Sequence, residues 1–197
     1  MSDPRLIDRM LETVERNIVP LTEQGVKIGN KVFGAAILRK SDLSLVIAGT
    51  NNETANPLWH GEIHTLKLLY EMPRAARPKP AECLFLSTHE PCSMCLSAIT
   101  WAGYDNFTYL FSHEDSRDSF SIPHDLRILK QVFTLDAGGY AKTNEYWSCF
   151  DLMNLIAACN EGVQAGFTAR VDALKRSYAE MSDIYQANKG DNEIPLK

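Results

Sequence analysis

Two short stretches carry side chains that can bind a metal ion and move protons. His60 and Glu62 lie two residues apart, and Cys92 and Cys95 lie three apart directly after Pro91. Proline is favoured as the opening residue of a helix, so both sulfurs are expected on one face of its first turn. The unsatisfied N–H groups at that end of a helix favour the thiolate form, which binds metals. The sequence therefore predicts a site in which one imidazole and two thiolates meet beside a carboxylate.

This ligand set predicts a catalytic zinc ion. Zinc takes four ligands, so His60, Cys92 and Cys95 would leave one position open, as catalytic sites have and structural sites lack. Two thiolates neutralise the charge of the ion and weaken it as an acid, so a base close by is needed to take a proton from the bound water. Glu62 is placed to act as that base without being a ligand.

The cysteine pair alone leaves other interpretations open. Cys-x-x-Cys is also found in thiol oxidoreductases and between two buried cysteines. A fourth protein ligand such as His89 would instead give a zinc-stabilised binding module without activity. Both alternatives leave Glu62 without a chemical role.

The surrounding pattern predicts strands and helices that would position these residues. An amphipathic helix is expected from Asp3 to Pro20, and a helix after His60 is expected to end before Pro73. Strands are expected at 32–38, 43–49, 83–87 and 107–111, the first two as a hairpin, with a further helix at 92–102. Alternating strands and helices imply right-handed crossovers and helices on both faces of a sheet. The two chemical stretches then fall at the carboxyl ends of strands.

The C-terminal part of the chain has a different pattern. Beyond Asn144 we expect helices only, with Tyr146, Trp147 and Phe150 in the core or at a pocket mouth. An apolar stripe from Val171 to Tyr185 is expected to face the core or a partner subunit. The predicted organisation is a catalytic domain at 1–140 and a helical extension at 141–197, packed on the same domain or on a partner.

Composition limits the class of protein. The chain has 197 residues, which fits one domain or one domain with an extension, and no run approaches the roughly 18 apolar residues of a membrane span. The first twenty residues are rich in charge, so we expect no signal peptide and a cytoplasmic location. The net charge of -5 favours a small-molecule partner over a nucleic acid, because phosphate binding usually requires a basic face.

Together the two stretches form H-x-E followed by P-C-x-x-C, and at these residues the chain resembles the cytidine and deoxycytidylate deaminase superfamily. The resemblance covers roughly Val32 to Phe111. The segment from Thr88 to Cys95 is most similar to the branch containing guanine deaminases and transfer-RNA adenosine deaminases. The resemblance implies a zinc cofactor, a homodimer, and a three-layer α/β/α cytidine-deaminase-like fold with a mixed, roughly five-stranded sheet and a helical C-terminal extension.

The resemblance also implies a reaction and further site residues. Glu62 would take a proton from the attacking water, return it to a ring nitrogen and pass another to the leaving amine, which releases ammonia. An asparagine before the H-x-E stretch, Asn51 or Asn52, would bind the base. Asp125 lies near the region where guanine deaminases carry an acid that reads the purine.

Three positions depart from the resembled branch. That branch usually has alanine where Gly61 stands, leucine where His89 stands, and a small residue where Trp59 stands. We expect Trp59 and His89 to line the pocket and to influence the choice of substrate.

We therefore expect a zinc-dependent hydrolytic deaminase of a free nucleobase, a nucleoside or a related amino-heterocycle, with a guanine-like purine favoured. The alternative within the enzyme class is a transfer-RNA adenosine deaminase. The alternative of another class is the non-catalytic zinc-stabilised binding module. For the homodimer, the stripe from Val171 to Tyr185 is the expected subunit contact.

Overall fold

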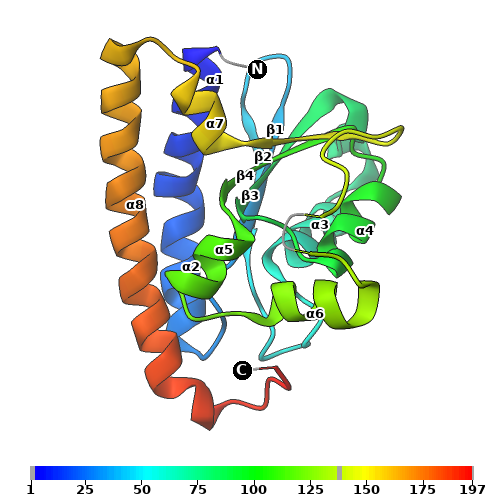
Figure 1. Ribbon diagram of the computed structural model, residues 1–197. Helices are drawn as coiled ribbons and strands as arrows, with labels where there is room; N and C mark the ends of the chain where they lie inside the picture. Colours follow the sequence, from blue (N-terminus) through cyan, green and yellow to red (C-terminus); the bar gives the residue numbers. More distant parts are fainter. Residues whose placement is uncertain (1–2, 137–138, 197) are drawn as a thin grey trace.

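A mixed sheet of five strands lies between two layers of helices in the computed structural model, which describes residues 3–136 and 139–196 (Figure 1). The strands are β1 (Gly34–Arg39), β2 (Leu45–Thr50), β3 (Cys83–His89), β4 (Asn106–Phe111) and β5 (Ser148–Asp151). The α-helices are α1 (Pro4–Thr13), α2 (Val19–Lys27), α3 (Gly61–Glu71), α4 (Ser93–Trp101), α5 (His113–Asp118), α6 (His124–Phe133), α7 (Leu152–Ala157) and α8 (Glu161–Asn188). The three-layer α/β/α fold predicted from the sequence is confirmed.

The strand directions bring the two chemical stretches to one edge of the sheet. The order is β2-β1-β3-β4-β5, with β1 antiparallel to both β2 and β3, and with β3, β4 and β5 parallel. The carboxyl ends of β2 and β3 therefore lie at the same edge, together with the amino end of β1. His60 follows β2 and Cys92 follows β3. Open α/β sheets bind their ligands at such an edge.

The central strands are buried on both faces, which explains their continuous apolar runs. In β1, Ala36 and Leu38 face a core formed with α1, α2, α7 and α8, whereas Ala35 and Ile37 face a second core formed with α3 and α4. The structure thus holds the sheet between two separately packed layers of helices (Figure 1). Packing on both faces restricts movement of the strand ends that carry the site.

The long helix α8 packs along α1 and α2 (Figure 1). Its buried side chains are Phe167, Val171, Leu174, Tyr178, Met181, Ser182 and Tyr185. The stripe from Val171 to Tyr185 therefore belongs to the core of its own chain, and its expected role as a subunit contact is wrong. Although α8 has 28 residues, no helix in the described part of the chain has both the length and the apolar character needed to cross a membrane.

The N-terminal helix continues past Pro20 instead of ending there. A π-helical segment, Val14–Ile18, separates α1 from α2, and the N–H of Val19 bonds to the carbonyl of Val14. Proline has no N–H to donate, and a π-turn changes the hydrogen-bond pattern just before it. The helix can therefore pass Pro20 and reach Lys27.

The sequence pattern predicts helices only beyond Asn144, and this prediction is wrong for part of the segment. Residues Ser148–Asp151 form β5, which pairs in parallel with β4 through Asn106↔Ser148 and Thr108↔Phe150. A strand of four residues is too short to show a clear period in the sequence. The sheet is therefore completed by a strand from the C-terminal part of the chain.

A close approach of backbones joins β1 to the start of α3. A Cβ atom at Gly61 would lie 2.7 Å from the Cα of Gly34 and 2.8 Å from its nitrogen. On the other side, the hydroxyl of Thr88 accepts from the Gly34 N–H and donates to the Gly34 carbonyl, both at 3.0 Å. Gly34 thus contacts the segments that carry both halves of the site.

Replacing Gly61 by alanine should destabilise the protein by about 1 to 3 kcal/mol, because overpacking against backbone forces a shift. Urea unfolding measures the effect. The matched control is Gly166→Ala in α8, where a Cβ meets nothing within 4 Å. That change should stabilise the chain by about 0.4 to 1 kcal/mol. Equal effects of the two substitutions would contradict the close approach.

Candidate metal centre

The three metal-ligand candidates lie at the amino-terminal ends of two helices. His60 is the N-cap of α3 and Cys92 is the N-cap of α4, both with extended backbone conformation, and Cys95 lies in the first turn of α4. Pro91 therefore precedes the N-cap and does not open the helix. The N–H groups at the start of α4 remain available to the sulfurs, which favours thiolates.

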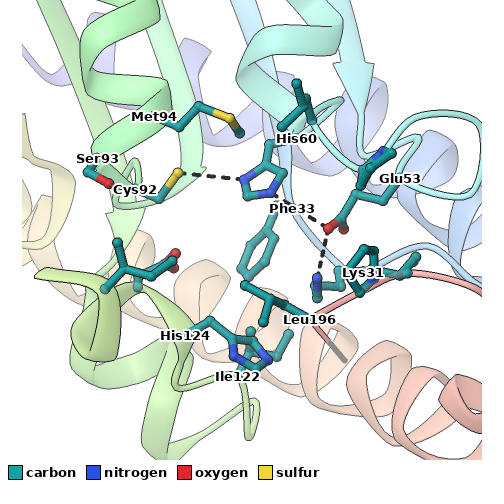
Figure 2. A pocket seen from close by; sticks show the side chains of 16 residues that line it. Lys31, Phe33, Glu53, His60, Cys92, Ser93, Met94, Ile122, His124 and Leu196 are labelled. Carbon is teal, nitrogen blue, oxygen red and sulfur yellow. Dashed lines mark hydrogen bonds and ion pairs between the residues drawn. The ribbon is translucent and has the colours of Figure 1, made fainter. Parts of the chain in front are cut away.

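The ligand atoms of His60, Cys92 and Cys95 lie within 4.8 Å of one another. The Nδ1 of His60 lies 3.6 Å from the Sγ of Cys92 (Figure 2). The Cys95 side chain and then His60 hydrogen-bond the Cys92 sulfur and hold the pKa of that thiol well below its usual value. Two buried sulfurs and one imidazole are donors that zinc prefers, so this group fits a zinc ion.

Glu62 is buried beside these residues. Its carboxylate accepts a hydrogen bond from the hydroxyl of Ser87 at 2.9 Å. Burial, with a further contribution from the charge of the Cys92 sulfur, raises the pKa of the Glu62 carboxyl. A carboxylate with a raised pKa is suited to taking up a proton and returning it.

A cavity of about 360 Å³ lies beside the candidate ligands. His60 and Cys92 lie at its wall, and Asp125 faces it from α6. The main apolar lining residues are Phe33, Met94, Ile122, Ile128, Ile194 and Leu196. A largely apolar cavity with a few polar groups is typical of a small-molecule site. Figure 2 shows that His60 and Cys92 lie on one side and that Ile122, His124 and Leu196 lie across from them.

The sequence model of the cytidine and deoxycytidylate deaminase zinc-binding region matches residues 9–111, about half of the chain. The chain belongs to this deaminase family. Membership shows that the cofactor is zinc and that the protein is a hydrolytic deaminase.

Two individual proteins and one solved structure are similar to this chain. The chain is 31% identical to the guanine deaminase of Bacillus subtilis (strain 168) over 55% of this chain and 69% of the relative. It is 25% identical to the probable cytosine deaminase of Schizosaccharomyces pombe over 58% of this chain and 68% of the relative. Among solved structures, a mutant of NE0047 in complex with 8-azaguanine matches with a TM-score of 0.52 and 17% identity, over 92% of this chain and 84% of that chain. This last likeness concerns the fold.

Of the other predicted site residues of this deaminase, some lie at or near the cavity and others lie away from it. Asp125 lines the cavity, and burial together with the Cys92 sulfur raises the pKa of its carboxyl to about 8. Asn51 is buried, donates through Nδ2 to Glu53, and leaves its Oδ1 without a hydrogen-bond partner. Asn52 is half-buried, and its backbone N–H bonds the carbonyl of Trp59. Asn51 is thus the asparagine with a buried free acceptor.

Trp59 does not line the cavity. Its ring stacks on His64 with centroids 5.7 Å apart, and the Nζ of Lys67 lies 4.9 Å from its ring centroid. The side chain has turned onto α3, because the residues at 64 and 67 present flat and cationic partners on that helix. The expectation that Trp59 shapes the pocket is not met by this geometry.

His89 also lies away from the cavity wall. Its ring is enclosed by Phe33, Phe111, Phe120 and Tyr178, with centroid separations of 4.7 to 5.3 Å. Its Nδ1 lies 3.0 Å from the hydroxyl of Thr88, and its Nε2 has no hydrogen-bond partner. Phe33 stands between this cluster and the cavity, because it belongs both to the core and to the cavity wall. His89 is therefore a core residue and is not brought to the metal group.

The C-terminal aromatic residues are also away from this cavity. Trp147 is buried and donates from Nε1 to the hydroxyl of Thr100 at 2.8 Å. Phe150 lies in β5, and Tyr146 is 61% exposed. Of the three, Trp147 belongs to the core that the sheet forms with α3 and α4.

Several cavity residues were not predicted from the sequence. Lys31 and Glu53 lie in the wall as a buried ion pair, and Ile194 and Leu196 cover the cavity from the C-terminal segment. Ser87 holds Glu62 from β3. No local signal in the sequence marks Lys31 and Glu53 as a buried pair, because charged residues in a polar loop are usually solvated.

The buried imidazole of His89 should make stability depend on pH. Burial lowers the pKa of His89 from 6.5 to about 3, so the unfolded chain binds a proton that the folded chain does not. The stability contribution is therefore complete above about pH 6.5 and falls as the pH drops toward about 3. Relative to the parent protein, His89→Leu should gain on the order of 1 to 2 kcal/mol in unfolding free energy between about pH 6.5 and about pH 5. Urea titrations at both pH values measure the difference, and a constant difference would contradict a neutral buried imidazole.

Proposed function

We propose that this deaminase converts a free purine base of the guanine type to its oxo form, with His60, Cys92 and Cys95 as zinc ligands and Glu62 as the proton carrier. The observation that carries the proposal is that the three ligand candidates lie together, with His60 and Cys92 in the wall of a small, largely apolar cavity, and that Glu62, two residues after His60, is buried. The identity to the guanine deaminase of Bacillus subtilis supports the choice of a purine base.

Zinc, when bound, would polarise and activate the attacking water. The residues of the chain perform the remaining tasks. Glu62 takes one proton from water and delivers it to a ring nitrogen, and it passes the second to the exocyclic amine. The C–O bond forms as the ring nitrogen takes up the first proton, and the C–N bond then breaks as the amine takes up the second, so water and the amino-heterocycle give the oxo-heterocycle and ammonia. The Ser87 hydroxyl orients the Glu62 carboxylate through its bond to Oε1.

The shape of the cavity supports a free base over a polynucleotide. Phe33 offers a flat ring face, and Asp125 offers a carboxyl that can bind ring N–H groups. Ile194 and Leu196, near the C-terminal end of the described residues, add further apolar lining. The net charge of -5 adds no attraction for phosphate groups. A transfer RNA would need a basic face.

An ammonia-release assay tests the substrate. Protein of measured zinc content is given guanine, adenine, cytosine and guanosine, each in turn. Release from guanine above all others is the expected result. Release from cytosine and from no purine would reassign the substrate, and zinc-loaded protein that releases ammonia from none would overturn the proposed activity.

Glu62→Gln should lower kcat by about 10² to 10⁴-fold, because the amide cannot carry the proton. Zinc content should remain close to one per chain, since Glu62 is not proposed as a ligand. Steady-state kinetics and metal analysis are the measurements. The matched control is Glu71→Gln at the exposed end of the same helix, which should keep parental activity.

Asp125→Asn should weaken recognition of guanine. Burial raises the pKa of this carboxyl to about 8, so at neutral pH it is mainly an uncharged hydrogen-bond partner. Its loss is worth about 0.5 to 1.5 kcal/mol, so kcat/KM should fall roughly 2 to 10-fold. Zinc content and the unfolding midpoint should stay near parental values. The same change at the exposed Asp118 is the control. An Asp125→Asn protein with parental kcat/KM for guanine would remove Asp125 from the proposed binding site.

We also propose a cytoplasmic homodimer. All five cysteines are free thiols, which suits a reducing compartment. Exposed apolar side chains on α4 and α6, among them Trp101 at 91% and Val132 at 67% exposure, support association through this face. Sedimentation over a range of concentrations determines the state of assembly.

A further inference from the structure

A buried ion pair lies beside the candidate metal ligands. The Nζ of Lys31 lies 2.7 Å from the Oε1 of Glu53, and the two side chains are 5% and 1% exposed. The other carboxylate oxygen of Glu53 accepts from the Nδ2 of Asn51 at 2.5 Å. Lys31 precedes β1 and Glu53 follows β2, so the pair lies at the edge of the sheet where the site is built. Glu53 is thus held from two sides.

The imidazole of His60 lies between this pair and the cysteines. Its Nδ1 faces the Sγ of Cys92, and its Nε2 faces the Oε1 of Glu53, each at 3.6 Å. Figure 2 shows the resulting row of contacts from Cys92 through His60 and Glu53 to Lys31. The two ring nitrogens therefore have different neighbours, sulfur on one side and carboxylate on the other.

This arrangement needs an explanation beyond packing. Burying two charges costs free energy that their attraction does not always repay, and an apolar pair of similar volume is often at least as stable. A carboxylate on the far nitrogen of a metal-binding histidine, by contrast, fixes the ring orientation and keeps the proton on that nitrogen. Glu53 occupies this place, and Lys31 and Asn51 prevent its carboxylate from turning away.

We propose that Glu53, held by Lys31 and Asn51, is a positioning residue that keeps the ring of His60 oriented with Nδ1 toward Cys92 and Cys95 and with the proton on Nε2. This inference rests on the proposed role of His60 as a zinc ligand. Glu53 acts through His60 and does not itself bind the ion.

The decisive variant neutralises both charges at once. In Lys31→Met with Glu53→Gln no charge is left buried without a partner, so the fold should keep its stability. Loss of the carboxylate should nevertheless weaken zinc binding by about 10 to 100-fold. Chelator competition at fixed pH measures the zinc dissociation constant. Nitrogen-15 NMR of labelled histidine in the zinc-free proteins reports which ring nitrogen of neutral His60 carries the proton, and it should show Nε2–H in the parent and a mixture in the variant.

A matched control removes an exposed ion pair. Lys40→Met with Asp105→Asn eliminates a pair at 2.8 Å between the end of β1 and the start of β4, and zinc affinity should not change. Parental zinc affinity and an unchanged His60 tautomer in a folded Lys31→Met, Glu53→Gln protein would overturn the inference, because the pair would then be structural only.

Two further variants complete the test. If the double variant does not fold, Glu53→Asp keeps the charge but withdraws the carboxylate by one methylene, and zinc affinity must still fall. Parental affinity in Glu53→Asp would overturn the inference. His60→Ala separates this outcome from failure of the proposed function, because zinc binding that survives His60→Ala would exclude His60 as a ligand whatever Glu53 does.

Discussion

The site depends on how the backbone of Gly34 is held at the amino end of β1. Thr88, at the end of β3, bonds both backbone groups of Gly34, while Gly61, at the start of α3, packs against its other side. The ligand candidates come from segments about thirty residues apart, and both segments contact this one residue. Any displacement of β1 would move His60 relative to Cys92. The geometry of the metal group is therefore a property of the sheet edge and not of either motif alone.

The two layers of helices contribute to the site in different ways. On one face, α3 and α4 start at the site and extend away from it, so their first turns supply His60, Glu62 and the cysteines. On the other face, α1, α2 and α8 carry no ligand candidates and pack behind β1 and β3. Aromatic rings from several segments fill the space behind the cavity, including Phe33 and Tyr178. The apolar layer thus gives the site a rigid back wall.

Much of this arrangement could be predicted from local sequence. His60, Glu62, Cys92 and Cys95 have fixed spacing within a turn of their helix starts, so their grouping follows once the strands are placed in order. The hairpin and the two crossovers also followed from pattern. These features depend on residues close to one another in the sequence. The periodicity of apolar residues is a reliable indicator of such local structure.

Other features depend on contacts between distant segments. Glu53 and Lys31 are 22 positions apart, and a charged residue in a polar loop is usually solvated, so nothing local distinguishes a buried pair. His89 lies beside the cysteines in sequence, yet rings from positions 33, 111, 120 and 178 draw it into the core. The strand β5 has four residues and gains its stability only from pairing with β4.

The position of β5 in the C-terminal part of the chain affects how the protein can be truncated. The family match ends at residue 111, but β4 has both faces buried and needs β5 to pair its outer edge. A fragment cut after the last matched residue would present an apolar strand with a row of free N–H and C=O groups, which invites self-association. The same cut would remove α8 and uncover the apolar sides of α1 and α2. The part of the chain that carries the chemistry is therefore not a part that can be isolated in soluble form.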